Sequence, residues 1–252
     1  MNRAERQDGK AVLIIQARMG STRLPGKSLM DLAGAPLVGR ILERVRRCRT
    51  LGQIVLAIPE GDADTPLAPL AETYGVTLFR GSQNDLVDRY YQAARAHGAD
   101  IVLRLPADNP VPEPEEIDRI LAYHRQADVD FSSNLAQVLG NGYPDGIGAE
   151  VFDFDSLARV HDTVTDPERR EHVHLSFFNY KDQAPVDGTR VGTIPCPSAF
   201  SRPDLVLDVN TAEQYAFLKA LYEALYPANP NFHITDIIRW YDGVWKTKGT
   251  DQ

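Results

Sequence analysis

Cysteine is scarce in this chain of 252 residues, which contains only Cys48 and Cys196. The two cysteines have neither metal-like nor redox-like spacing, which argues against a disulfide framework and against a zinc site. This usage fits a reducing compartment, and we therefore expect a cytoplasmic protein. Long apolar runs are also missing: Ala11–Ile15 and Ile54–Ile58 are only strand-length, and residues 1–10 are polar and charged. The sequence therefore predicts neither a signal peptide nor a membrane span, and no membrane partner is expected.

An excess of positive charge is lacking as well. The chain has 27 Lys and Arg against 35 Asp and Glu, which gives a formal net charge of −8. Nucleic-acid phosphates require clustered Lys and Arg, so no nucleic acid is expected as a partner. The basic residues are nevertheless frequent in the first fifth of the chain, which leaves a local anion site open. A chain of this length with 43% hydrophobic residues is able to bury one substantial core.

Short apolar runs alternate with helical patterns through the first half of the chain. Uninterrupted apolar runs predict buried strands at 11–15, 53–59, 76–79 and 101–105. The helical period predicts helices at 36–49, 65–74, 86–97 and 115–125. This alternation predicts an α/β, Rossmann-like three-layer fold with a mostly parallel central sheet. Ligands of such sheets bind at the carboxyl ends of the strands, so the loops that follow these strands should converge on one site.

The pattern weakens beyond residue 130. The range 134–148 is rich in Gly, Asn and Pro and predicts a long surface loop. Further helices are predicted at 154–160, 168–180, 211–225 and 234–241. A strand is predicted at 190–195, and a second one at 205–209 should return to the core.

The strongest chemical signal is the segment Gln16-Ala-Arg-Met-Gly-Ser-Thr-Arg-Leu-Pro-Gly-Lys27, which directly follows the first strand. A glycine-containing loop brings backbone N–H groups close to phosphates. Arg18 and Arg23 offer bidentate forks for phosphate oxygens, and Lys27 supplies a compact charge near a leaving pyrophosphate. The alternative is a solvated basic loop, but solubility explains cations at the end of a buried strand poorly. A P-loop would require Ser28 to bind metal, and the order of the residues points elsewhere.

This order resembles the cytidylyltransferases typified by CMP-Kdo and CMP-sialic acid synthetases, and most closely their SpsF-like branch. The segment 16–27 matches almost residue by residue, and the resemblance extends from about residue 11 to residue 220. Further matching blocks follow in the family's order: Phe79-Arg-Gly-Ser82, Asp85 to Tyr90, Arg104 to Pro110, Ser133-Asn134, Tyr143-Pro-Asp-Gly146 with Glu150, Arg170-Glu-His-Val173 and Leu207-Asp-Val209.

The resemblance implies the nucleotidyltransferase (GT-A-like) form of the predicted fold. Residues 11–252 would form a single domain, with 131–203 as an inserted acceptor and dimerisation subregion and 1–10 as a flexible N-terminus. A homodimer is implied in the same way. The implied reaction is the attack of an acceptor oxygen on the α-phosphate of CTP with release of pyrophosphate, in surface polysaccharide biosynthesis.

The resemblance also implies roles for individual residues. Arg18, Arg23 and Lys27 would be catalytic, balancing charge as the leaving group departs. The implied nucleotide-binding residues are Gln16, Ala17, Arg18, Met19, Gly20, Ser21, Arg23, Lys27, Arg80, Gly81, Ser82, Asp85, Pro106 and Ala107. The acceptor is expected to be small, anionic and Kdo-like or nonulosonic. Its implied contacts are Arg104, Asn134, Tyr143, Asp145, Glu150, Arg170 and His172.

Asp108 and Asp208 are expected to hold Mg²⁺, because two carboxylates from separate strand ends are able to bind the ion against triphosphate oxygens. Instead of binding metal, Asp108 could be a turn residue and Asp208 could begin a helix. Arg80 and Ser82 are expected to read the cytosine edge, as this loop does in similar synthetases.

Two further positions have alternative interpretations. Asp85 and Arg89 are four residues apart, so instead of contributing to the site they could form a surface ion pair, which would stabilise the protein little. The block Arg170–His172 either contacts the acceptor or is part of a solvated helix. His172 is a residue type that is able to act as a general base or to donate a hydrogen bond to the acceptor.

Two departures from the family leave the acceptor open. The chain has Pro106-Ala107 where the family usually has Thr-Gly, and His174 where it has Thr. One alternative is a cytidylyltransferase acting on a phosphorylated or phosphonate acceptor. Another is a nucleotide-sugar-dependent glycosyltransferase, for which Asp62-Ala-Asp64 or Asp128-Val-Asp130 would supply the carboxylate pair. A non-catalytic nucleotide sensor is the third alternative.

Overall fold

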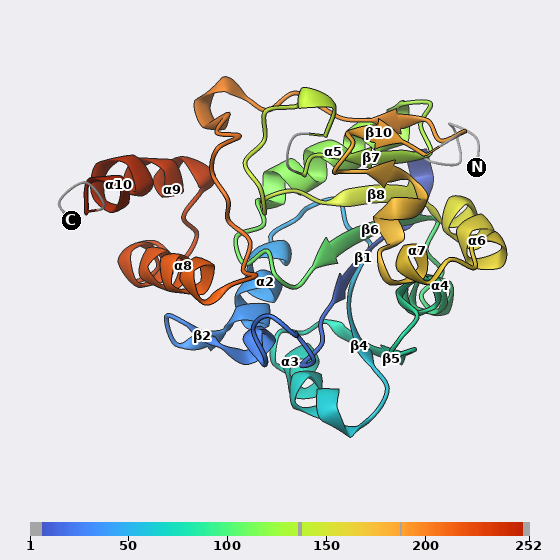
Figure 1. Ribbon diagram of the computed structural model, residues 1–252, viewed down its shortest axis with the longest axis horizontal. Helices are drawn as coiled ribbons and strands as arrows, with labels where there is room; N and C mark the ends of the chain where they lie inside the picture. Colours follow the sequence, from blue (N-terminus) through green and yellow to red (C-terminus); the bar gives the residue numbers. More distant parts are fainter. Residues whose placement is uncertain (1–6, 136–137, 187, 249–252) are drawn as a thin grey trace.

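The computed structural model describes residues 7–135, 138–186 and 188–248. Its centre is a seven-stranded sheet of order β11-β7-β8-β6-β1-β4-β5 (Figure 1). The strands are β1 (Ala11–Gln16), β4 (Gln53–Pro59), β5 (Thr77–Gly81), β6 (Ile101–Pro106), β7 (Phe131–Ser133), β8 (Glu150–Asp153) and β11 (Val191–Gly192). The pairs β1–β4, β1–β6, β4–β5 and β7–β11 are parallel, and β8 runs antiparallel between β6 and β7. The predicted mostly parallel α/β sheet is confirmed.

The two faces of the sheet bury separate apolar clusters. Along β1, Leu13 and Ile15 belong to one cluster, whereas Val12 and Ile14 belong to the other, because successive side chains of a strand point to opposite faces. The first cluster includes residues of α2 (Leu37–Val45), α3 (Ala68–Thr73), α5 (Pro114–Gln126), α8 (Ala212–Leu225) and α9 (Ile234–Trp240). The second includes residues of α4 (Leu86–Ala96) and α6 (Phe154–Thr163). The predicted three layers follow from these two buried faces (Figure 1).

Shorter elements connect these layers. They are β2 (Asp31–Leu32), β3 (Ala35–Pro36), α7 (Pro167–Glu171), β9 (Phe178–Asn179), β10 (Ala184–Pro185), α10 (Lys246–Lys248), a π-helical turn (Tyr241–Trp245) and 3₁₀ turns at Lys27–Leu29, Asp62–Leu67, Val138–Gly140, Val173–Ser176 and Ser198–Phe200. None of the helices in the described ranges combines the length and apolar character that crossing a bilayer requires.

Two predicted elements of the second half are wrong in type. The helix predicted at 168–180 ends after one turn, because His172 has φ −118° and ψ 83°, outside the helical region. The strand predicted at 205–209 does not enter the sheet. It is an extended segment that makes one isolated bridge, between Asp145 and Val206. The strand predicted at 190–195 is reduced to β11.

The structure places the expected subregion 131–203 and the expected N-terminal segment 1–10 as follows. Three strands of the range 131–203, namely β7, β8 and β11, belong to the main sheet. Of the expected flexible N-terminus, residues 1–6 lie outside the described residues. The Gly9 carbonyl accepts a hydrogen bond from Arg125, and the Lys10 N–H donates to Asp100 at 2.7 Å.

Candidate active site

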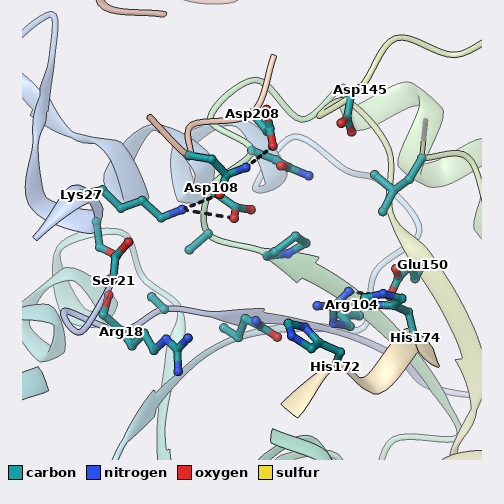
Figure 2. Close-up of a pocket in the computed structure, with 18 of the residues that line it drawn as sticks. Arg18, Ser21, Lys27, Arg104, Asp108, Asp145, Glu150, His172, His174 and Asp208 are labelled. Atoms are coloured by element: carbon teal, nitrogen blue, oxygen red, sulfur yellow. Dashed lines mark hydrogen bonds and ion pairs between the residues drawn. The ribbon is translucent and has the colours of Figure 1, made fainter. Parts of the chain in front are cut away.

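A cavity of about 640 Å³ opens where the carboxyl ends of β1 and β6 meet. The loop 16–27 lines one side of it, and the segment from His172 to Gln183 lines another. Figure 2 shows Lys27 reaching toward Asp108, with His172, His174, Arg104 and Glu150 gathered away from Lys27. The strand-end prediction therefore located the cavity, because parallel strands deliver their following loops to one edge of the sheet.

The loop 16–27 is held in shape by its own backbone and by one carboxylate. Met19 N–H donates to the Asp64 carboxylate at 2.6 Å, and Ser28 Oγ donates to the Arg18 carbonyl at 3.0 Å. Gly26 has φ 72°, in the left-handed region that favours glycine, and its N–H bonds back to the Met19 carbonyl. The turn at Gly26 thereby brings Lys27 to the cavity wall.

The cations of this loop already contact groups that line the cavity. Lys27 Nζ lies 3.2 Å from the Asp108 carboxylate and donates to the Val209 carbonyl at 2.7 Å. Arg23 donates to Asn210 Oδ1 at 2.8 Å. Arg18 lies 3.3 Å from Glu171 in an exposed ion pair, which is weak because solvent screens it. Arg18 is therefore free to exchange Glu171 for an anionic ligand at little cost.

Asp108, Asp145 and Asp208 lie together in the cavity wall, next to Lys27. Val209 N–H donates to the Asp108 carbonyl at 2.7 Å, and Leu207 N–H donates to the Asp145 carbonyl at 3.1 Å. These bonds hold the extended segment 205–209 against the end of β6 and position Asp208 there. Burial, and then Asp208 and Asp108, raise the pKa of Asp145 to about 6. Burial, and then Asp108, also raise the pKa of Asp208. Burial is the main cause of both shifts, and the neighbouring carboxylates add to it.

This donor set fits a magnesium ion completed by substrate. Carboxylate oxygens are the ligands that Mg²⁺ prefers, and in nucleotide enzymes it commonly uses one or two protein carboxylates together with substrate phosphates. Among the described residues, no group of three or more His, Cys, Asp or Glu side chains forms a metal site by itself. Asp108 and Asp208 are the carboxylates that would hold the ion, and its charge would relieve their mutual repulsion.

The end of the cavity away from Lys27 contains a buried ion pair. Arg104 on β6 and Glu150 on β8 are register partners, and their side chains are 2.7 Å apart. Tyr180 OH donates to the other Glu150 oxygen at 2.9 Å. Arg104 Nε and His174 Nδ1 are buried without a hydrogen-bond partner among the described residues. Unpaired buried polar atoms are costly, so this end of the cavity is suited to a polar ligand.

Burial keeps His174 neutral. Its pKa is lowered to about 4 by burial, an effect that the nearby Arg104 and His172 reinforce and Glu150 opposes. Since Arg104 is neutralised by Glu150, this end of the cavity offers hydrogen-bonding groups with little net charge.

A second cavity of about 210 Å³ adjoins the first and shares Gln16, Ala17, Arg18 and His172 with it. Its remaining lining residues are Gln83, Asn84, Leu86, Arg89 and Glu171. The loop after β5 supplies Gln83 and Asn84, and α4 supplies Leu86 and Arg89. The two cavities together form one elongated site along the carboxyl edge of the sheet.

Most of the residues singled out in the sequence line this site. They are Gln16, Ala17, Arg18, Ser21, Arg23, Lys27, Arg104, Pro106, Ala107, Asp108, Asp145, Glu150, His172 and Asp208. The structure does not bring the others to the lining of either cavity. These are Met19, Gly20, Arg80, Gly81, Ser82, Asp85, Asn134, Tyr143 and Arg170.

Three charged side chains outside the cavities, those of Arg80, Asp85 and Arg170, have local partners. Arg80 donates to the Gly61 carbonyl and to Thr65 Oγ1, both at 3.3 Å. Asp85 caps α4 and pairs with Arg170 at 2.6 Å, not with Arg89. The surface pair of Asp85 with Arg89 that the spacing allowed is therefore not formed.

Three more of these residues, Asn134, Tyr143 and Gly81, have packing roles. Asn134 is fully buried and bridges the Glu116 carbonyl and the Ala149 N–H, while the buried Tyr143 OH donates to Glu116. A Cβ on Gly81 would lie 2.8 Å from Phe79 and 3.0 Å from the Arg89 side chain, so glycine makes room for that side chain.

Sequence reasoning left several lining residues without a role. The most informative are His174, Tyr180, Gln183, Asn210, Gln83, Asn84 and Arg89. The strand-end rule would have found Gln83 and Asn84, which lie in the loop after β5. Tyr180 carries no such signal, because the helix predicted at 168–180 placed it on the wrong kind of element.

Comparison with solved structures defines the class. A cytidylyltransferase from Leptospira borgpetersenii superposes with a TM-score of 0.82 and 26% identity, over 93% of this chain and 94% of that one. A CMP:2-keto-3-deoxy-manno-octonic acid synthetase complexed with CTP (TM-score 0.62, 18% identity, 85% and 98% coverage) shares the fold. So does the Rv0371C protein of Mycobacterium tuberculosis in complex with manganese (0.54, 17%, 84% and 98%). The fold is that of the nucleotidyltransferases.

Sequence comparison identifies the family. The cytidylyltransferase family matches residues 12–223. The spore coat polysaccharide biosynthesis protein SpsF of Bacillus subtilis is 32% identical over 84% of this chain and 86% of its own length. The chain belongs to the cytidylyltransferase family. The prediction of a nucleotidyltransferase of SpsF-like type is confirmed.

Other relatives match over shorter segments. An uncharacterized protein of Methanocaldococcus jannaschii is 34% identical over 65% of both chains. The 3-deoxy-manno-octulosonate cytidylyltransferase of Anaeromyxobacter sp. (strain Fw109-5) is 36% identical over 44% of this chain and 46% of its own. The match thus spans less than two thirds of either relative.

Proposed function

We propose that the protein transfers CMP from CTP to a hydroxyl of a small anionic, sugar-like acceptor and releases pyrophosphate. One observation carries the proposal: the cations of the loop 16–27 and the carboxylates of Asp108 and Asp208 line one cavity of about 640 Å³, with Lys27 in contact with Asp108. Family membership supports CTP as the nucleotide, and the likeness to a 3-deoxy-manno-octulosonate cytidylyltransferase supports a Kdo-like acceptor, with a nonulosonic acid as the other candidate.

The chain's residues would act mainly by positioning and charge neutralisation. Arg18, Arg23 and Lys27 would bind the β- and γ-phosphates, and the hydroxyl of Ser21 would donate to them. As the acceptor oxygen bonds to the α-phosphorus, the bond to the pyrophosphate oxygen breaks, and Lys27 balances the charge on the departing group. Mg²⁺, bound by Asp108 and Asp208, would neutralise negative charge on the phosphate oxygens.

The acceptor would bind at the end of the cavity that Arg104, Glu150 and His172 line. We assign His172 to take the proton of the acceptor hydroxyl, because it is exposed to the cavity. His174 is a poor base, since burial lowers its pKa to about 4.

We further propose a cytoplasmic homodimer acting in surface polysaccharide biosynthesis. The SpsF relative is a spore coat polysaccharide biosynthesis protein, which supports the polysaccharide assignment. Size-exclusion chromatography with light scattering would test the dimer, and a monomer at micromolar concentration would contradict it.

The glycosyltransferase alternative has little support in the geometry. Asp128 and Asp130 pair with Arg190, and neither lines either cavity. Asp64 is occupied by the Met19 N–H. A glycosyltransferase would also leave the three cations of the first loop without a role.

The test is incubation with CTP, MgCl₂ and a panel of acceptors, with pyrophosphate release and product mass as readouts. The panel comprises 3-deoxy-manno-octulosonate, a nonulosonic acid and 2-C-methyl-erythritol 4-phosphate. We expect a CMP adduct of one of the two keto acids, and no product when EDTA replaces the metal. A product from the phosphate alone would redirect the acceptor assignment, and binding of CTP without any turnover would support a nucleotide sensor.

A further inference from the structure

The carboxylate of Asp208 is held by two side chains that follow it in the sequence. Gln214 Nε2 donates to Asp208 Oδ1 at 2.9 Å, and Asn210 Nδ2 donates to Oδ2. The backbone of the extended segment 205–209 fixes where Asp208 lies, whereas these two bonds fix which way its carboxylate faces. A carboxylate has about four lone-pair sites, so each oxygen of Asp208 is still able to bind a further ligand.

The side chain of Gln214 presents its amino group to Asp208 because its oxygen is already committed. Gln214 Oε1 accepts from the Asn210 N–H at 2.7 Å and from the Thr211 N–H at 3.0 Å. Thr211 Oγ1 accepts in turn from the Gln214 N–H, which completes a capping box at the start of α8. Since two backbone donors point at Oε1, Nε2 is the group left to face Asp208. The start of α8 therefore sets the orientation of this carboxylate.

Asn210 and Gln214 differ in their relation to the cavity. Asn210 lines the larger cavity, and its Oδ1 accepts from Arg23 at 2.8 Å, so it is able to contact a ligand directly. Gln214 lines neither of the two cavities. Any effect of the Gln214 side chain on ligand binding must therefore act through Asp208.

We propose that Gln214 is a positioning residue that orients the Asp208 carboxylate toward the divalent ion and so couples the start of α8 to the site. Hydrogen bonds to the ligands of a metal fix their orientation, and losing one typically lowers metal affinity about 10- to 100-fold. This inference rests on the proposed function, because it takes Asp108 and Asp208 as the carboxylates that hold Mg²⁺ against CTP.

A purely structural role for Gln214 is the competing interpretation, since the same side chain caps α8. Thr211 separates the two roles. Thr211→Ala removes the hydroxyl of the capping box, but it keeps the Thr211 backbone N–H that holds Gln214 Oε1. The bond from Gln214 to Asp208 should therefore survive in this variant, which makes Thr211→Ala the matched control.

The test measures the affinity for CTP by calorimetry without acceptor, once in MgCl₂ and once in EDTA. The ratio of the two affinities gives the contribution of the metal, and the wild type should bind CTP more tightly in MgCl₂. Gln214→Ala should lower this ratio about tenfold, the lower end of the loss expected when a metal ligand loses an orienting hydrogen bond. Its affinity in EDTA should stay close to that of the wild type. Asp208→Asn should lower the ratio at least as much, and Thr211→Ala should leave it unchanged.

The outcomes distinguish this inference from the proposed function. If the wild type binds CTP in neither solution, the proposed function fails and the inference fails with it. If Asp208→Asn lowers the ratio and Gln214→Ala does not, only the inference is overturned. The same holds if Gln214→Ala weakens binding equally in both solutions, or if Thr211→Ala lowers the ratio as much, because Gln214 would then only cap the helix.

Thermal unfolding of each variant checks that the fold is intact. Thr211 is exposed and Gln214 is partly exposed, so water is able to replace the lost capping bonds. Should Gln214→Ala nevertheless not fold, Gln214→Met fills a similar volume without a polar group. The same ratio is then measured, and an unchanged value for Gln214→Met would overturn the inference.

Discussion

Lys27 shows how one side chain links the two halves of the site. It reaches from the first loop to the Asp108 carboxylate, 81 residues later, and to the Val209 carbonyl beyond that. Its ammonium is largely buried, with 13% of the side chain exposed, so its interaction with phosphate would be screened little by solvent. A residue in this position has a larger effect on a charged transition state than on folding.

We predict that Lys27→Ala lowers kcat by about 10²- to 10³-fold, because a preorganised charge at the leaving group is lost. The fold should survive, since Asp108 remains partly exposed. Pyrophosphate release with the acceptor that supports wild-type turnover is the measurement, with thermal unfolding alongside. Lys219→Ala, an exposed lysine of α8, is the matched control and should keep wild-type activity. Undiminished pyrophosphate release by Lys27→Ala would contradict the assignment.

The Arg104–Glu150 pair is the second residue-scale feature with a measurable consequence. We predict that Glu150→Gln lowers the free energy of unfolding by about 3 kcal/mol, because it leaves a buried guanidinium without its counter-charge. Urea denaturation measures this loss. The double variant Arg104→Met/Glu150→Met should be more stable than Glu150→Gln, since it buries no unpaired charge. If Glu150→Gln were as stable as the wild type, groups other than Glu150 would be compensating the charge of Arg104.

At the scale of elements, α7 is a short helix fastened over the site by one arginine. Asp166 caps its N-terminus by accepting from the Arg169 N–H at 2.9 Å. Arg170 pairs with Asp85 at the start of α4 and also donates to the carbonyls of His161 and Val164. The segment that follows carries His172 and His174 into the cavity wall. Arg170 therefore orients cavity residues while lining no cavity itself.

We predict that Arg170→Ala increases amide hydrogen exchange in residues 166–176 at least tenfold, with a loss of global stability of about 1–2 kcal/mol. The reason is that the Arg170 side chain joins this segment to the start of α4 through its ion pair with Asp85. Exchange followed by mass spectrometry gives the measurement. Arg169→Ala is the control, since Arg169 makes no ion pair in the ranges that the structure describes. If residues 166–176 of Arg170→Ala exchanged their amide hydrogens at wild-type rates, Arg170 would not be holding this segment in place.

At the scale of the whole molecule, the sheet separates two apolar faces and gathers polar groups at one edge. Buried ionisable groups of that edge make stability depend on pH. His174 is the clearest case, because burial lowers its pKa from an ordinary value of 6.5 to about 4. A depressed histidine pKa means that the folded state binds fewer protons than the unfolded state. Its stabilising contribution is therefore complete above pH 6.5 and is lost as the pH falls toward 4.

We predict that the wild type loses about 2–3 kcal/mol through His174 between pH 7 and pH 4. His174→Gln has no such titration and should show a correspondingly flatter dependence. The measurement is the free energy of unfolding from urea titrations at several pH values in this window. His97, whose pKa burial also lowers, remains in both proteins, so the difference between the two curves isolates His174. Parallel curves would refute the prediction.

The sequence alone determined the layered fold and the edge of the sheet where ligands bind. Uninterrupted apolar runs such as 11–15 are local signals of buried strands, and a basic loop after such a strand points to the sheet's carboxyl edge. Roles that depend on contacts distant in sequence were decided only by the tertiary structure. Arg89 looked like a partner of Asp85 because they are four residues apart, yet Arg170, 85 residues away, takes that carboxylate. Spacing along a helix fixes which side chains are near, but burial and long-range partners fix which of them remain free to bind.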